Sequence, residues 1–264
     1  MRVKSGSLIS MIPVVFCVFV SLGYAIEKDT IVGIWFLDEE QGNLAKDSSD
    51  NSYDGEILGD VEFVEGKFAG ALHFSAGDQN FVSIPHEDSL NLTTWSTTAW
   101  INMDSPGAQV IVSKGSEPAN LFNYYIQLRD TGIANSGFFS GGWCEAWGTT
   151  NIQAEQWYHI AGTYDMGTLT IYVDGTLEAE EAFGSEPVVN TEPLAIGAYS
   201  GGIDWGASGV IIDEVGVFNS ALSADEVKDI MTKGLGEATG MAAVSSAGKS
   251  ATAWGRIKVH YERR

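Results

Sequence analysis

Residues 157–175 read WYHIAGTYDMGTLTIYVDG. From Leu169 to Val173 every second side chain is apolar, so these side chains fall on one face of an extended chain. Residues 174–175, an Asp-Gly pair, favour a tight hairpin turn, because glycine tolerates a positive φ. Residues 165–167 turn the preceding segment back. The stretch therefore predicts two antiparallel strands with a turn at each end.

Similar short β-type runs recur along the chain, separated by clusters of Gly, Asn, Asp and Ser. The expected strands are Ile31–Leu37, Phe81–Ile84, Thr98–Met103, Gln109–Ser113, Tyr124–Arg129, Trp157–Tyr164, Thr168–Val173, Leu194–Ile196 and Val210–Phe218. Their spacing is that of an antiparallel sandwich or barrel, and not that of strands alternating with helices. The sequence therefore predicts an all-β fold.

One helix is expected near the end of the chain. Ser223 and Glu226 have the spacing of a capping box, in which each side chain binds the backbone amide of the other. Apolar residues then recur at helical spacing up to Met231. From Lys233 the composition shifts to Gly, Ala, Ser and Thr, so residues 233–264 are expected to be a linker and a basic, weakly ordered tail. An added strand or a contact segment is the alternative for the tail.

Residues 1–25 have the pattern of a secretory signal peptide. Basic residues precede an uncharged run, residues 8–22, and small residues lead to an expected cut near Ala25. A membrane-spanning helix needs about 20 apolar residues, and this run is shorter and contains Pro13. We therefore expect a secreted, periplasmic or cell-surface protein with no membrane span in the mature chain. An uncleaved anchor is the alternative.

The two cysteines are Cys17, in the expected signal peptide, and Cys144. A mature chain with Cys144 alone forms no internal disulfide, although an oxidising compartment favours such bonds. No motif of His and acid accompanies Cys144, so we expect it to be a half-buried structural residue rather than a nucleophile.

The charge of the chain is strongly negative, at −21. The acidic residues gather in residues 26–232, whereas residues 233–264 are basic. An acidic body repels nucleic acid and anionic membranes, so no nucleic-acid partner is expected. Its acidity also suits calcium-rich or saline surroundings, but solubility alone explains it as well.

Four further segments accompany the opening stretch. Residues 35–39 read WFLDE, residues 47–49 DSS, residues 66–74 GKFAGALHF and residues 212–223 IDEVGVFNSALS. In this order, and with residues 157–175, they resemble the motifs of LamG-like jelly-roll domains, which are members of the concanavalin A-like lectin/glucanase superfamily.

The resemblance covers about residues 30–232 and implies one domain, residues 26–232, in which two antiparallel sheets form a jelly-roll sandwich. It implies function only loosely, because the fold is found in binding modules, adhesins and enzymes.

A calcium site is one implication of the resemblance. Asp213 interrupts an apolar strand, and a buried carboxylate is costly unless it is hydrogen-bonded, paired or bound to a metal. Relatives with this fold often hold a structural calcium with Asp side chains and carbonyls. Calcium takes six to eight oxygen ligands, so Asp38 and Asp47 are the expected partners of Asp213. The alternative is that Asp213 accepts hydrogen bonds from backbone amides or pairs with a basic residue.

A ligand site is expected from aromatic residues among Gly and Ser. Trp143, Trp147 and Trp205 lie in segments that are expected to be loops, with Tyr199 and Asp204 near Trp205. Flat exposed rings suit sugar rings, and Asp side chains bind sugar hydroxyls. The alternative is that these rings close the rim of the sandwich as core.

No catalytic pair is apparent. Retaining glycosidases place two carboxyl groups about 5–5.5 Å apart, which in glucanases of this fold gives an E-x-D-x-x-E pattern that the chain lacks. Glu178 and Glu180 have a suitable spacing but indicate a solvated strand edge, and Asp213 and Glu214 are adjacent and expected to face opposite ways.

We therefore expect a secreted, non-catalytic module that binds a glycan or another extracellular polymer and is stabilised by calcium. The alternatives are an adhesion or structural protein whose C-terminal tail binds a surface protein, and a glycan-active hydrolase.

Overall fold

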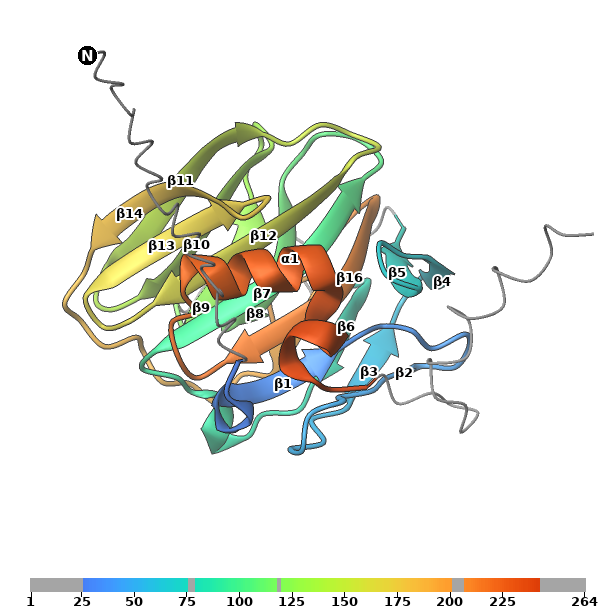
Figure 1. Ribbon diagram of the computed structural model, residues 1–264, viewed down its shortest axis with the longest axis horizontal. Helices are drawn as coiled ribbons and strands as arrows, with labels where there is room; N and C mark the ends of the chain where they lie inside the picture. Colours follow the sequence, from blue (N-terminus) through green and yellow to red (C-terminus); the bar gives the residue numbers. More distant parts are fainter. Residues whose placement is uncertain (1–25, 76–78, 118–119, 201–206, 243–264) are drawn as a thin grey trace, which may run out of the picture.

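The computed structural model describes residues 26–75, 79–117, 120–200 and 207–242. Two antiparallel sheets pack face to face, and a single α-helix lies outside them within this part of the chain (Figure 1). The expected two-sheet sandwich with one C-terminal helix is confirmed. The expected signal peptide and the tail from residue 243 lie outside the described residues.

The sheet that carries the helix, here called sheet A, is built around the strand pair predicted first. Its order is β14 (Thr176–Ala182), β13 (Thr168–Val173), β12 (Trp157–Tyr164), β7 (Trp95–Met103), β16 (Val210–Phe218), β5 (Gly70–Phe74) and β4 (Val61–Glu65), and β1 (Ile31–Trp35) also pairs with β16.

The opposite sheet, sheet B, has the order β11 (Trp143–Asn151), β10 (Ile133–Phe139), β9 (Tyr124–Leu128), β8 (Gln109–Lys114), β15 (Leu194–Ile196), β6 (Phe81–Ile84), β3 (Gly55–Leu58) and β2 (Leu44–Ala45). Short 3₁₀ helices at Lys28–Thr30 and Asp88–Leu90 complete the described elements. All nine expected strands are present, five with the expected ends and four with one end that differs by one to three residues.

The core lies between the two sheets, where alternate side chains of each strand meet. Trp95 is fully buried there, and its ring contacts those of Tyr124, from sheet B, and Tyr164, from sheet A. Cys144 also faces this core as a free thiol and is more buried than expected. Burial of apolar surface between the sheets therefore holds the described domain together without a disulfide.

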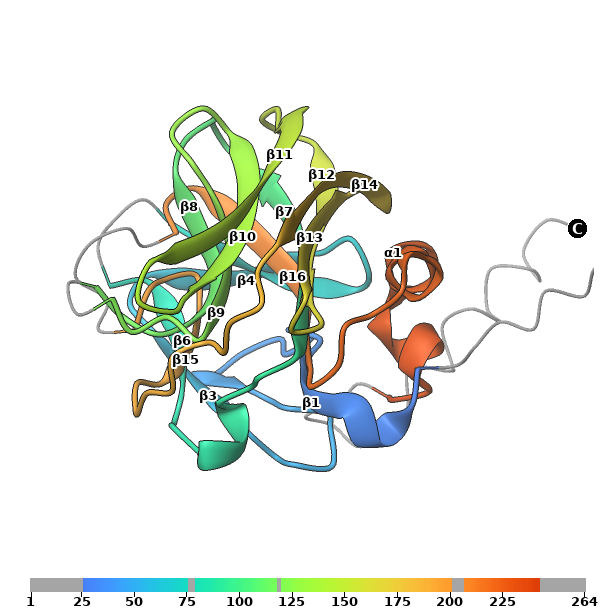
Figure 2. The same ribbon diagram turned by 90° about the vertical axis from the view of Figure 1, so that its left-hand side faces the viewer.

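Helix α1 (Ala224–Thr239) packs on the outer face of sheet A (Figure 2). The predicted capping box is present: Glu226 donates its amide to Ser223 Oγ at 3.3 Å, and the Ser223 amide donates to Glu226 Oε2 at 2.7 Å. The expected linker from residue 233 is wrong for its first residues. The chain kinks at Gly234, where φ is 78°, and stays helical to Thr239 because Leu235 is buried against the sheet.

No helix in the described residues is long and apolar enough to cross a membrane.

Candidate functional site

The outer face of sheet B carries a group of aromatic and polar side chains at the end formed by β9, β10 and β11. Along β11, Cys144 and Ala146 point into the core, so Trp143, Glu145 and Trp147 point outward. The register aligns them with the neighbouring strands: Phe139 pairs with Trp143, Gly137 with Glu145 and Tyr125, and Asn135 with Trp147 and Gln127. These side chains therefore form one continuous surface.

A pocket of about 250 Å³ opens on this surface. Its lining residues are Glu117, Gln127, Arg129, Trp143, Glu145 and Tyr199. They come from two strands, β9 and β11, and from three connecting segments that are far apart in the sequence.

The floor of the pocket is a hydrogen-bonded network centred on Glu145. Its Oε1 accepts the Tyr125 hydroxyl at 2.7 Å and the Asn135 amide at 3.1 Å. Gly137 pairs with Glu145 in the sheet, and a Cβ atom there would stand 2.5 Å from the Tyr125 hydroxyl oxygen. A glycine at this position therefore leaves room for the Tyr125 hydroxyl to reach Glu145. Asn135 Oδ1 is buried and has no hydrogen-bond partner among the described residues.

Tyr199 forms the wall opposite β11. Its hydroxyl donates to Gln127 Oε1, and its ring packs edge-on against Phe122 at 4.8 Å. Burial raises the pKa of the Tyr199 hydroxyl and of the Tyr125 hydroxyl above the ordinary value. Both hydroxyls are therefore neutral hydrogen-bond donors at physiological pH.

Trp143 presents its ring to solvent while other rings fix its position. The centroids of Phe122, Phe139 and Tyr125 lie 5.4, 5.5 and 6.1 Å from that of Trp143, yet 43% of Trp143 is exposed. Trp147 is 42% exposed, and the Arg129 guanidinium carbon lies 5.6 Å from its ring centroid. Trp143 and Trp147 therefore present two aromatic faces to solvent on one side of β11.

The expected ligand residues are partly brought together. Trp143 and Trp147 are exposed, but they lie in β11 and not in loops: the Gly141-Gly142 turn ends before Trp143, and the following residues pair with β10. Tyr199 is buried and lines the same pocket as Trp143. Asp204 and Trp205 lie outside the described residues.

Gln127, Arg129, Glu145 and Glu117 were not expected in the site. The alternation of Trp143, Glu145 and Trp147 is a strand signal that would have indicated Glu145. The other three reach the pocket through pairing of β8 to β11, which their local sequence does not reveal.

The three expected calcium ligands, Asp38, Asp47 and Asp213, accept hydrogen bonds from different backbone segments. Asp47 uses both oxygens locally: Oδ1 accepts the amides of Ile34 and Ser49, and Oδ2 accepts the Tyr53 amide and the Ser49 hydroxyl, all at 2.6–2.9 Å. Its carboxylate thereby fixes the segment between β2 and β3 against β1.

Asp38 and Asp213 hold the turn between β4 and β5. Asp38 Oδ1 accepts the Gly70 amide at 2.8 Å, and Asp213 Oδ2 accepts the Phe68 amide at 2.9 Å. The second oxygen of Asp213, Oδ1, is buried without a hydrogen-bond partner in the described part of the chain. Binding of Asp213 to backbone amides, the alternative to a metal, is therefore observed.

Burial dominates the electrostatics of this acidic cluster. It raises the pKa of Asp213 to about 8, that of Glu214 to about 7 and that of Asp38 to about 6. Glu214 has a φ of 52° and lies in a bulge of β16, so the expected alternation with Asp213 is interrupted there. Its carboxylate accepts the Leu235 amide at the kink of α1.

Among the described residues, no group of three His, Cys, Asp or Glu side chains is arranged to hold a metal ion. The set Asp38, Asp47 and Asp213 is thus not brought together as ligands: Asp38 and Asp213 accept amides of the β4–β5 turn, whereas Asp47 accepts amides of β1 and of the segment between β2 and β3.

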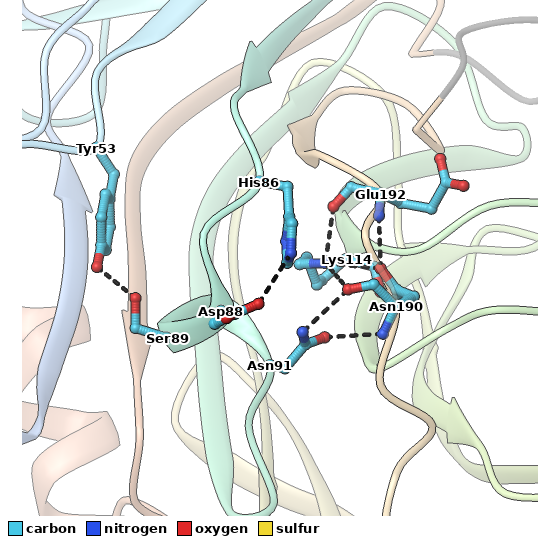
Figure 3. Close-up of polar contacts among 8 residues, drawn as sticks. All are labelled: Tyr53, His86, Asp88, Ser89, Asn91, Lys114, Asn190 and Glu192. Carbon is cyan, nitrogen blue, oxygen red and sulfur yellow. Dashed lines mark hydrogen bonds and ion pairs between the residues drawn. The ribbon is translucent and has the colours of Figure 1, made fainter.

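A buried lysine, Lys114, lies at the start of the segment that carries Glu117, and Figure 3 shows its hydrogen bonds to Asn190 and Glu192. Lys114, at the end of β8, is fully buried, and its Nζ donates to Asn190 Oδ1 at 2.6 Å and to the Glu192 carbonyl at 2.7 Å. Burial lowers the pKa of Lys114 to about 8. The Asn190 amide in turn donates to the Leu121 carbonyl at 2.8 Å. The network anchors both ends of the segment that carries Glu117.

A larger pocket, of about 450 Å³, lies beside β1 and is lined by Lys28, Asp29, Ile31, Val32, Asp50, Asn51, Tyr53, Ser89 and Asn219. Its one aromatic ring, Tyr53, is tied to Ser89 by a hydrogen bond of 2.5 Å. It lacks the exposed indole platforms of sheet B, so the sheet B pocket is the better candidate for ligand binding.

Comparisons with known proteins support the fold. A family model described as the concanavalin A-like lectin/glucanases superfamily matches residues 76–228. Comparison with curated protein sequences gives no match.

Among solved structures, the binding domain of Paraclostridial Mosquitocidal Protein 1 is similar with a TM-score of 0.63 and 16% identity over 78% of this chain and 52% of that one. Domain 4 of AbnA, an extracellular arabinanase from Geobacillus stearothermophilus, in complex with arabinotriose, has a TM-score of 0.61 and 19% identity over 77% of this chain and 98% of that one.

A third similar structure is that of botulinum neurotoxin type C, a toxin whose cell entry depends on interaction with two ganglioside molecules. It has a TM-score of 0.59 and 13% identity over 78% of this chain and 51% of that one. The chain thus spans about half the length of the toxin structures and nearly all of the arabinanase domain. At these identities the similarity establishes the fold alone.

Proposed function

We propose, since this chain belongs to the concanavalin A-like lectin/glucanase superfamily, that it is a non-catalytic module that binds carbohydrate through the outer face of sheet B. The observation that carries the proposal is Trp143, whose ring is 43% exposed although three neighbouring rings fix it. A fixed apolar face loses little conformational entropy when a sugar ring stacks on it.

The polar groups around Trp143 suit sugar hydroxyls. Glu145 and Gln127 offer carboxylate and amide groups, and Arg129 offers N–H donors, all within one pocket. Sugar hydroxyls both donate and accept, so a pocket with both kinds of partner satisfies them when water is displaced. The solved relative bound to arabinotriose, which the chain covers almost entirely, adds support by analogy.

The hydrogen bonds of the Glu145 carboxylate support the proposal that the module is not an enzyme. A glycosidase needs two carboxyl groups that flank the scissile bond. Glu145 Oε1 already accepts hydrogen bonds from Tyr125 and Asn135, as expected for a residue that positions the floor of the pocket. Glu117 is the second carboxylate of the pocket, and a pair of carboxylates is what a glycosidase uses. The binding test described next therefore also measures release of reducing sugar.

A glycan array probed with the protein and with a Trp143→Ala variant tests this function. We expect binding to at least one carbohydrate, and loss of about tenfold or more in affinity for the variant. Leu177→Ala, which removes an exposed apolar side chain from β14, is the matched control and should bind as the native protein does. Binding that survives Trp143→Ala unchanged would contradict the site, and release of reducing sugar from the bound glycan would contradict the non-catalytic role.

Export is part of the same proposal. The pattern of residues 1–25 supports cleavage near Ala25, and an extracellular polymer is accessible only to an exported protein. Mass spectrometry of the protein from its source is expected to show a mature chain that starts near Ile26. A chain that keeps residues 1–25 would indicate the anchor instead. Docking to a surface protein through the basic tail is the alternative role, and a pull-down that depends on residues 243–264 would favour it.

A further inference from the structure

The outer face of sheet B holds two indole rings in line. Trp143 and Trp147 lie on the same face of β11, four residues apart, and each is more than two-fifths exposed. A strand advances about 3.3 Å per residue, so the two positions are about 13 Å apart along the strand. One sugar ring is too small to cover both.

The surface between the two indoles is polar and low. Glu145 lies between them on β11, and beside it Gly137 contributes no side chain. Gln127 and Arg129 follow on β9 and just after it, and Arg129 lies against the Trp147 ring. Polar groups that are flanked by stacking platforms form a track rather than a closed cavity.

The charge of this track disfavours an acidic ligand. Two carboxylates, Glu117 and Glu145, and one cation, Arg129, line the pocket, and the chain as a whole carries −21. A uronate or sialate would meet net repulsion on approach, whereas a neutral sugar would not.

We propose that the track binds an internal stretch of a linear, neutral polysaccharide, with sugar rings on Trp143 and on Trp147 and hydroxyls facing Glu145. This inference rests on the proposed carbohydrate function and specifies its ligand class. A run of about three linked rings matches the separation of the two indoles.

Binding as a function of chain length tests this inference. The probes are immobilised linear oligosaccharides of one to six units from arabinan, xylan and mannan, and from the acidic polymer polygalacturonate. We expect the affinity for one neutral series to rise about tenfold or more from one unit to three units and then to level off. Trp147→Ala should lower the affinity only for the longer members, whereas Trp143→Ala should lower it for every length. Leu177→Ala is again the matched control.

Several results would overturn the inference while leaving carbohydrate binding intact. They are a single sugar that binds as tightly as the trimer, a Trp147→Ala variant that binds long chains normally, or a preference for polygalacturonate. Failure to bind every neutral series, with binding to another glycan of the array, would also overturn the inference alone. Absence of binding on the whole array would overturn both the inference and the proposed function.

Discussion

Asp213 shows how one side chain joins two distant motifs. The GKFAGALHF segment turns sharply before β5, and the Asp213 carboxylate of the IDEVGVF segment accepts the amide of Phe68 in that turn. The adjacent Glu214 accepts the amide of Leu235 at the kink of α1. The acidic pair therefore fixes a turn on one side and a helix on the other, and this role is structural.

The raised pKa of Asp213 predicts a stability that falls with pH. Its pKa is about 8 in the folded protein against 3.8 for the ordinary group, so the folded state prefers the protonated form. The stabilisation is complete below about pH 4 and is lost as pH rises through 8, at no more than about 1.4 kcal/mol per pH unit for one proton. Asp213→Asn should therefore be closest to the native protein in stability below about pH 4 and should exceed it increasingly up to pH 8, as measured by urea unfolding in EDTA. An unfolding free energy that changes equally with pH in both proteins would contradict this prediction.

The calcium site that the resemblance implies can be tested with the same pair. A cation at Asp213 would bind the unpartnered Oδ1 and favour the charged carboxylate. If calcium binds there, adding it at pH 8 raises the melting temperature of the native protein and not of Asp213→Asn. Equal melting temperatures with calcium and with EDTA would rule out this site.

His159 predicts the opposite pH dependence. The ring is fully buried beside Trp100, at 5.3 Å between centroids, and both ring nitrogens lack hydrogen-bond partners among the described residues. Burial lowers the pKa of His159 to about 3, so its contribution to stability is complete above pH 6.5 and is lost as pH falls through 3. His159→Phe keeps an aromatic ring that takes up no proton. Its unfolding free energy should fall less than that of the native protein between pH 6.5 and 4, and an equal fall would contradict the assignment.

At the scale of elements, the edge of sheet B is closed by a side chain from sheet A. β11 is an edge strand, and β14 is the edge strand of the opposite sheet. Glu178 of β14 accepts the amides of Thr149 and Thr150 at 2.6 and 3.0 Å. The sequence indicates a solvated edge for Glu178, and the structure shows that its carboxylate also occupies amides that a foreign strand would otherwise pair with.

Glu178→Ala should therefore loosen the end of β11. Loss of the two amide hydrogen bonds is expected to cost about 1–2 kcal/mol and to speed hydrogen exchange at Thr149 and Thr150. Gly148→Ala should have a similar effect, since a Cβ atom there would stand 2.5 Å from Glu178 Oε2. Glu181→Ala, on the same strand, is the control. Unchanged exchange in both Glu178→Ala and Gly148→Ala would show that the carboxylate does not protect this edge.

The sequence predicts some elements well because their signal is local. β12 and β13 alternate regularly, and Ser223 with Glu226 fixes the start of α1. β10 and β11 were not expected, because their tryptophans and polar residues lie among Gly and Ser residues that resemble a loop. The pocket needs the pairing of these strands with β9, and Tyr199 reaches Gln127 across 72 positions of sequence. Local patterns carry no information on such contacts.

At the scale of the whole molecule, the two outer faces of the sandwich differ. The face of sheet A is covered by α1, whose buried residues continue the packing of β1 and β16 (Figure 2). The face of sheet B exposes Trp143 and Trp147. Because α1 covers the outer face of sheet A, the outer face of sheet B is the one that offers exposed aromatic side chains to an extended ligand.

The net charge of −21 predicts that salt stabilises the whole molecule. Repulsion among so many carboxylates opposes the compact state, and the described residues hold a single ion pair between a lysine and an acid, Lys233 with Asp229. Raising sodium chloride from 10 mM to 500 mM shortens the screening length from about 30 Å to less than 10 Å, so the melting temperature should rise. Sucrose at the same osmolality is the control, because it is excluded from the protein surface but does not screen charges. A double variant, Glu180→Lys with Glu181→Lys, moves the charge toward zero on the exposed strand β14 and should respond less to salt. A melting temperature that falls with salt would instead mean that favourable charge contacts outweigh the repulsion.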